Sequence, residues 1–112
     1  MAIYNFTLLH DFKLILAYHT QGEIIFWRYQ NLEPEIAGEI GERFVKASGY
    51  ILDDVVNTGS YAGYRDWFIQ EYRRPGYTVE TGFGVNPLPT SQFDKIYNDN
   101  IGILILGATL DI

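Results

Sequence analysis

The spacing of apolar positions predicts a chain in which short strands alternate with helices. Residues 12–18 (FKLILAY) form a short apolar run that ends before His19, which is typical of a buried strand. Residues 23–29 (EIIFWRY) are rich in β-branched and aromatic side chains and predict a second strand. Two further strands are expected at residues 50–56 and 77–80.

Helices are predicted between these strands. The clearest helical pattern lies in residues 34–48, where apolar side chains recur at spacings of four, four and three, at Ile36, Ile40, Phe44 and Ala47. Pro34 suits a first helical turn, and Gly49 suits the position just after a helix. Weaker patterns predict helices at residues 2–10, 61–72 and 92–106, with Ser91 as the cap of the last one.

The order of these elements predicts the fold class. Strands that alternate with helices indicate an α/β fold with a mixed, largely parallel sheet flanked by helices. The 112 residues are enough for one small domain with a single core. Nine Tyr, seven Phe and two Trp favour a stable core in so short a chain, because aromatic side chains bury a large area each. We therefore expect one structural unit over residues 1–112.

Composition excludes several classes of partner and site. The net charge of −6 and the lack of a basic run argue against binding to nucleic acid. The chain has no cysteine, which excludes disulfides and thiolate metal sites. The first ten residues do not read as a signal peptide, and the apolar run at residues 103–106 is too short to span a bilayer. The sequence therefore predicts a cytoplasmic protein with no membrane partner.

A few polar side chains stand where they could do chemistry, and each has a simpler interpretation. His19 follows a strand, where it could bind a metal ion or could bond to a nearby loop. Glu80 stands between a strand and a glycine turn, as a general base or as an ordinary surface carboxylate. Arg65 opens a helix and could bind a carboxylate or simply face water.

Three blocks of sequence share a resemblance to one family. The blocks are LAYHTQG at residues 16–22, GSYAGYRDW at residues 59–67 and YTVE at residues 77–80. In this order they resemble the C-terminal half of a zinc carboxypeptidase of the carboxypeptidase A type. The segments HTQGEIIFWRY, YAGYRDWFIQEYRRPGYTVE and NPLPTSQFDKIY are most similar to bacterial γ-D-glutamyl-L-diamino acid endopeptidases.

The resemblance implies a fold, a reaction and roles for particular residues. It implies part of a zinc-carboxypeptidase-like (phosphorylase/hydrolase-like) domain that cuts the bond between D-glutamate and a diamino acid in cell-wall peptides. It implies zinc as the cofactor, with His19 as one ligand and Glu80 as the general acid/base. The pocket loop implies substrate-binding positions at Thr58, Tyr61 and Arg65, and Arg65 would suit an acidic group such as the distal carboxylate of diaminopimelate.

The resemblance also identifies what the sequence lacks. The family takes two further zinc ligands from a His-x-x-Glu motif, but Lys13 and Gly22 stand three residues after the two histidines, His10 and His19. One protein ligand cannot make a catalytic zinc site. We therefore expect a truncated domain that binds zinc weakly, is inactive alone and forms a homo-oligomer through uncovered sheet edges or faces. The alternatives are a non-catalytic peptide-binding or assembly domain, or a relic.

Overall fold

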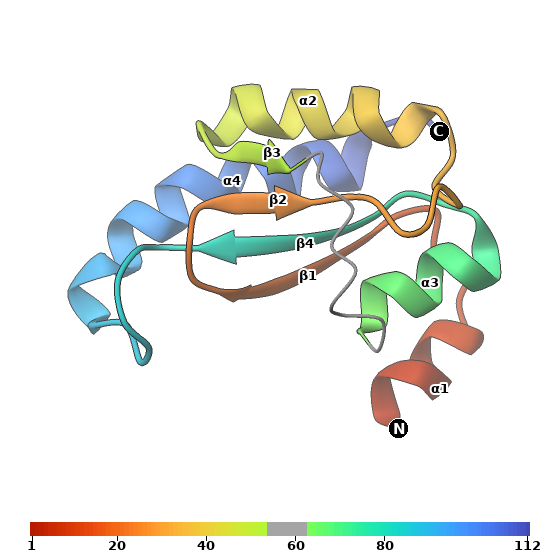
Figure 1. Cartoon of the computed structure of the whole chain (residues 1–112), viewed down its shortest axis with the longest axis horizontal. Coiled ribbons are helices and arrows are strands. Elements are labelled where there is room, and N and C mark those ends of the chain that lie inside the picture. Colours follow the sequence, from red (N-terminus) through yellow and green to blue (C-terminus); the bar gives the residue numbers. More distant parts are fainter. Residues whose placement is uncertain (54–62) are drawn as a thin grey trace.

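One four-stranded sheet organises the part of the chain that the structure describes (Figure 1). The structure is a computed structural model, and it describes residues 1–53 and 63–112. The strands are β1 (Ile15–Thr20), β2 (Ile24–Phe26), β3 (Ile51–Asp53) and β4 (Gly76–Thr81). Their order across the sheet is β1-β4-β2-β3; the outer pairs are parallel and the central pair β4–β2 is antiparallel. The predicted α/β class with a mixed, largely parallel sheet is confirmed.

Helices lie on both faces of this sheet. They are α1 (Ala2–Leu8), α2 (Ile36–Ser48), α3 (Tyr64–Tyr72), the short 3-10 helix η1 (Thr90–Gln92) and α4 (Phe93–Thr109). Figure 1 shows α2 and α4 along the upper side of the strands, with α3 and α1 on the lower side near one end. Among these helices and the rest of the described residues, none is long and apolar enough to cross a membrane.

The core lies between β4 and the helices α2 and α4. Alternate residues of β4 point to opposite faces of the sheet. On the face covered by α2 and α4, Tyr77 and Val79 are fully buried. The Tyr77 ring packs edge-on against Phe44 with 5.0 Å between ring centroids, and its hydroxyl donates to the Ala37 carbonyl at 2.7 Å. Burial raises the pKa of Tyr77 well above its usual range. The phenol therefore stays a neutral hydrogen-bond donor inside the core.

Glycine allows α2 to lie close to the sheet. A Cβ atom at Gly41 would stand 2.9 Å from Leu52 Cδ1, closer than real Cβ atoms approach a neighbour. Gly41 therefore permits close packing of α2 against Leu52 of β3. Gly49, which follows α2, adopts a φ of 79°, as its predicted place after the helix requires.

The boundaries of several predicted elements need correction. The first predicted strand begins at Ile15 rather than residue 12, because its ladder starts where the Ile15 N–H reaches the Pro75 carbonyl at 3.2 Å, and proline has no N–H to extend it. The second strand ends at Phe26, and α1 ends at Leu8. The predicted cap at Ser91 is wrong, because Ser91 lies inside η1 and Gln92 precedes α4.

Candidate functional site

The two residues that the sequence singled out most strongly lie side by side. His19 on β1 pairs in register with Glu80 on β4, near the carboxyl ends of two parallel strands. Neighbouring strands are about 4.8 Å apart, so the two side chains rise next to each other from the same face. They are 61 residues apart in the chain, and the parallel register of β1 and β4 brings them together.

A cavity lies over this pair of strands, against the start of α3. Its volume is about 250 Å³. The strands contribute its floor through Ala17, His19, Thr78 and Glu80, and the start of α3 contributes Gly63, Tyr64, Arg65 and Asp66. The cavity therefore joins the three residues for which the sequence suggested chemistry: an imidazole, a carboxylate and a guanidinium.

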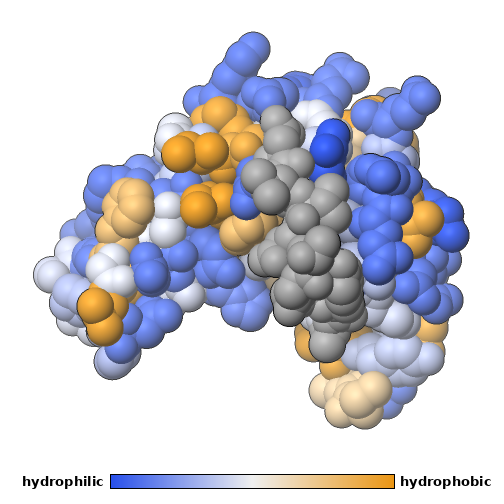
Figure 2. Space-filling model, viewed as in Figure 1, coloured by the Kyte–Doolittle hydropathy of each residue, from blue (hydrophilic) through white to orange (hydrophobic). Residues whose placement is uncertain are grey.

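The face in view in Figure 2 is mostly hydrophilic, with hydrophobic residues gathered in separate patches.

Glu80 carries an unusual oxygen atom. Its Oε2 is buried and has no hydrogen-bond partner among the described residues. Buried polar atoms almost always have a partner, so an exception calls for an explanation. His19, in contrast, is exposed. A partly buried carboxylate with one free oxygen, beside an accessible imidazole, can accept a proton from a molecule that enters the cavity.

Arg65 lies over the sheet and is fixed by its neighbour in the chain. Its Nε and Nη2 both donate to Asp66 Oδ1, at 3.0 and 2.7 Å, and the two side chains are only 14% and 4% exposed. Its stem passes Gly76, and its guanidinium carbon lies 5.9 Å from the centre of the Phe26 ring. Among the described residues Nη1 has no hydrogen-bond partner. One edge of the guanidinium thus stays available to a ligand.

The described residues do not by themselves fit a catalytic zinc ion. Such a site takes three protein ligands. Within residues 1–53 and 63–112, no three His, Cys, Asp or Glu side chains are grouped where they could hold a metal ion. The cavity offers only His19 and the carboxylates of Glu80 and Asp66, and Asp66 is engaged by Arg65.

The remaining predicted positions, Thr58 and Tyr61, lie outside the described residues. The structure adds two side chains that the sequence did not assign to the cavity, Tyr64 and Asp66. Asp66 is an acidic residue in the first turn of α3, a position where a carboxylate favours the helix start. Nothing in the sequence signalled its contact with Arg65, because adjacent residues of a helix do not usually face each other.

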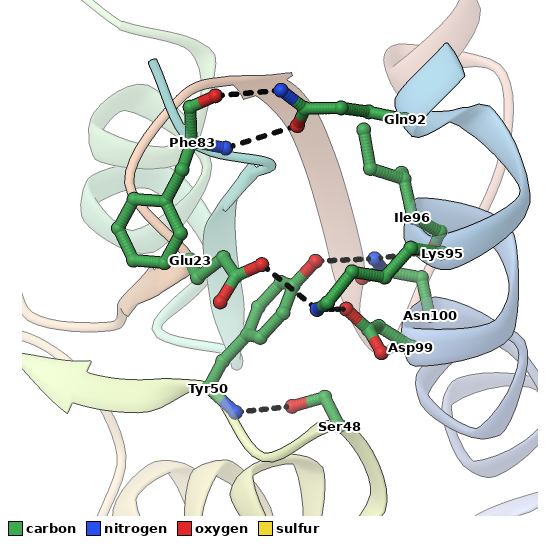
Figure 3. Close-up of polar contacts among 9 residues, drawn as sticks. All are labelled: Glu23, Ser48, Tyr50, Phe83, Gln92, Lys95, Ile96, Asp99 and Asn100. Atoms are coloured by element: carbon green, nitrogen blue, oxygen red, sulfur yellow. Dashed lines mark hydrogen bonds and ion pairs between the residues drawn. The ribbon is translucent and has the colours of Figure 1, made fainter.

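Polar contacts hold the chain that leaves β4 (Figure 3). The side-chain amide of Gln92 makes two hydrogen bonds to the backbone of Phe83, accepting from its N–H at 3.2 Å and donating to its carbonyl at 2.8 Å. One turn further on, Lys95 Nζ contacts Asp99 at 2.7 Å and Glu23 at 3.1 Å, which raises the pKa of Lys95. The Gln92 contacts tie the chain after β4 to the start of α4, and the contact between Lys95 and Glu23 ties α4 to the start of β2.

A buried amide continues this network toward the core. Asn100 donates from Nδ2 to the Tyr50 hydroxyl and to the Ile96 carbonyl, both at 2.9 Å (Figure 3). Burial raises the pKa of Tyr50 above its usual value. The phenol therefore stays protonated, and α4 is fixed in rotation relative to the sheet.

Two curated proteins are similar to this chain. It is 47% identical over 110 residues to γ-D-glutamyl-L-diamino acid endopeptidase 1 of Lysinibacillus sphaericus, a match that covers 98% of the chain and 27% of that protein. It is 53% identical over 90 residues to the uncharacterized protein YqgT of Bacillus subtilis (strain 168), covering 80% of the chain and 24% of that protein. No family model matches the chain.

These matches define what the chain is related to. It is homologous to a part of a γ-D-glutamyl-L-diamino acid endopeptidase, and it spans about a quarter of the length of the curated relatives it matches. The predicted similarity to these endopeptidases is confirmed for this segment. The wider assignment to the zinc carboxypeptidases, and the roles of the individual site residues, stay predictions.

Proposed function

We propose that this chain is a segment of a zinc peptidase that hydrolyses the γ-D-glutamyl–diamino acid bond of cell-wall peptides. The observation that carries the proposal is the register pair of His19 and Glu80 in one cavity with Arg65. The sequence similarity to an endopeptidase named for this reaction supports it. We place this activity in the cytoplasm, on peptides derived from the wall.

In this proposal Glu80 is the general acid/base. Its carboxylate takes a proton from the attacking water as the water oxygen bonds to the amide carbon. It then passes the proton to the amine nitrogen of the diamino acid as the carbon–nitrogen bond breaks. The free and buried Oε2 atom suits this role, because a carboxylate with an unsatisfied oxygen has room for one transferred proton.

Zinc belongs to the proposal only for a longer protein. His19 would supply one ligand there, and the bound metal would polarise the amide carbonyl. The chain alone is expected to hold zinc weakly, because a catalytic site takes three protein ligands. Metal analysis of the purified chain after dialysis tests this expectation. We expect far less than one zinc per chain, and one tightly held zinc per monomer would contradict it.

Arg65 is proposed to select the diamino acid. Its free Nη1 would bind the distal carboxylate of diaminopimelate, while Asp66 fixes the orientation of the guanidinium. Arg65→Ala should weaken cleavage of diaminopimelate peptides more than cleavage of lysine analogues. Arg43→Ala, on the exposed face of α2, is the matched control and should change neither. An equal loss on both substrates would contradict the assignment.

A chimaera tests the whole proposal. The matching segment of the L. sphaericus endopeptidase is replaced by this chain, and cleavage of a γ-D-glutamyl-diaminopimelate peptide is followed by mass spectrometry. We expect hydrolysis at the D-glutamyl–diamino acid bond. A folded chimaera that binds the peptide without cleaving it would instead support a non-catalytic peptide-binding domain.

A further inference from the structure

A second carboxylate lines the cavity at its α3 end. The side chain of Asp66 is almost fully buried, and it borders the cavity together with Arg65. Arg65 directs both Nε and Nη2 to the same oxygen of this carboxylate, Oδ1. Among the described residues no donor bonds to the other oxygen, Oδ2. Buried polar atoms almost always have a partner, so Oδ2 is suited to accept a hydrogen bond from a ligand.

The pair of Arg65 and Asp66 offers both signs of charge to a ligand. A guanidinium alone would repel the second ammonium group that every diamino acid carries, because like charges repel strongly where little water screens them. Asp66 balances this charge. With Nη1 free on Arg65 and Oδ2 free on Asp66, the pair can hold a carboxylate and an ammonium at the same time. It therefore complements a carbon atom that bears both groups, as at the distal end of diaminopimelate.

The other polar groups of the cavity are less suited to bind an ammonium. Glu80 is the proposed general acid/base. The Tyr64 hydroxyl is shared with Thr7 Oγ1 at 2.7 Å. His19 is exposed and becomes a cation when it binds a proton. Of the described residues that line the cavity, Asp66 is thus the one whose carboxylate is left for this role.

The length of the cavity floor fits a diamino acid. The Arg65 stem lies over Gly76, with Cγ 3.5 Å from where a Cβ atom would stand, and the guanidinium carbon is 5.9 Å from the centre of the Phe26 ring. Phe26 pairs with Thr78 across the sheet, so the charged pair lies near the level of Thr78. Thr78 precedes Glu80 by two residues, which is about 6.6 Å along a strand. In lysine or diaminopimelate, five single bonds of about 1.5 Å span roughly 6 Å between the nitrogen of the cut amide and the carbon that bears the second amino group.

We propose that Asp66 is a specificity-determining residue whose Oδ2 binds the distal ammonium of the diamino acid, beside the carboxylate site on Arg65. The inference rests on the proposed function, because it takes the amide bond of that diamino acid as the bond that is cut. It assigns the two charges different tasks. Asp66 recognises the group that lysine and diaminopimelate share, and Arg65 recognises the group that distinguishes them.

Four peptides that differ only in the residue after D-glutamate test the two charges separately. Diaminopimelate carries both distal groups, lysine only the ammonium, 2-aminopimelate only the carboxylate, and norleucine neither. Cleavage of each peptide is measured as kcat/KM in the chimaera with the L. sphaericus endopeptidase. Asp66→Asn keeps the shape of the side chain and an acceptor for Arg65 but removes the negative charge. We expect it to lower kcat/KM by about tenfold or more for the two peptides with the ammonium, and little for the two without it.

A matched control and a second comparison keep this test decisive. Asp94→Asn makes the same chemical change at the exposed start of α4 and should alter none of the four values. If Asp66→Asn lowers all four values equally, Asp66 only holds Arg65 in place and the proposal is overturned. The unmodified chimaera should also cleave the lysine peptide about tenfold faster or more than the norleucine peptide. Equal rates for these two peptides would overturn the proposal even if Asp66→Asn does not fold.

The result can be separated from that of the proposed function. A chimaera that cleaves the peptides without regard to the distal ammonium keeps the proposed function and removes only the role of Asp66. A chimaera that cleaves none of the four peptides contradicts the proposed function. The affinities of the four peptides, measured by titration calorimetry, then replace kcat/KM, with the same pattern expected for Asp66→Asn and the same equal loss contradicting it.

Discussion

Gly82 offers a direct test of how the end of β4 is held. It follows the strand that bears Glu80, its φ is +75°, and its carbonyl accepts from the Gly22 N–H at 2.7 Å. A Cβ atom there would lie 2.5 Å from Leu88 Cδ1 and 2.9 Å from Gln92 Oε1. Gly82→Ala therefore adds a steric conflict to a backbone conformation that side chains disfavour.

Gly49 is a matched control because it separates these two effects. Its φ is +79°, nearly that of Gly82, but a Cβ atom there would have no neighbour within 4 Å. Gly49→Ala should lower the free energy of unfolding by about 1 kcal/mol, the cost of a left-handed alanine. Gly82→Ala carries the same cost plus that of moving the side-chain ends of Leu88 and Gln92, which breaks the hydrogen bond from the Phe83 N–H to Gln92 and adds about 0.5–1.5 kcal/mol.

Equilibrium urea unfolding, followed by tryptophan fluorescence at one fixed protein concentration, measures both losses. The larger loss for Gly82→Ala should also show as weaker affinity of the chimaera for its peptide, because the cavity floor lies on β4. Equal losses for the two variants would mean that Leu88 and Gln92 do not pack on Gly82 as described. The account of how β4 is held would then be wrong.

Two further predictions follow from side-chain burial. Asp66→Ala should lower the free energy of unfolding by about 3–5 kcal/mol, because it leaves the largely buried Arg65 guanidinium unpaired. The double variant Arg65→Met/Asp66→Ala removes both charges and should lose clearly less stability. A double variant as unstable as Asp66→Ala would refute the pairing. Burial first, and Tyr50 second, raise the pKa of Tyr18 to about 12. In the unfolded chain a phenol titrates near pH 10. The neutral Tyr18 phenol therefore stabilises the folded state fully below pH 10, and this stabilisation is lost as the pH rises to about 12. Between pH 10 and pH 12 the free energy of unfolding should therefore fall less for Tyr18→Phe than for the unmodified chain. Alkaline denaturation curves that coincide for the two proteins would contradict this.

The order of the elements could be read from the sequence, whereas the order of the strands in the sheet could not. Apolar runs, the helical spacing in α2 and the glycine after it are local signals. The antiparallel pairing of β2 with β4 depends on contacts between residues more than fifty positions apart. The start of β1 depends on Pro75, about sixty residues away, so no local pattern could set that boundary.

The candidate site shows the same division. His19 and Glu80 stood out because each follows an apolar strand, and parallel strands bring such ends to one edge. Their direct register was not predictable, since it depends on the alignment of β1 with β4. The contact between Arg65 and Asp66 was not predictable either. It depends on how the start of α3 sits over Gly76, where the missing side chain leaves room for the arginine stem.

Glu80 is proposed to transfer the proton in peptide hydrolysis, and a pair of isosteric variants in the chimaera tests this role. Glu80→Gln keeps the shape of the side chain and removes its basicity, so kcat should fall by at least about a hundredfold with little change in peptide affinity. Glu71→Gln makes the same chemical change on the exposed side of α3 and should leave kcat unchanged. If the Glu80→Gln chimaera cleaves the D-glutamyl–diamino acid bond as fast as the Glu71→Gln chimaera, Glu80 is not the general acid/base.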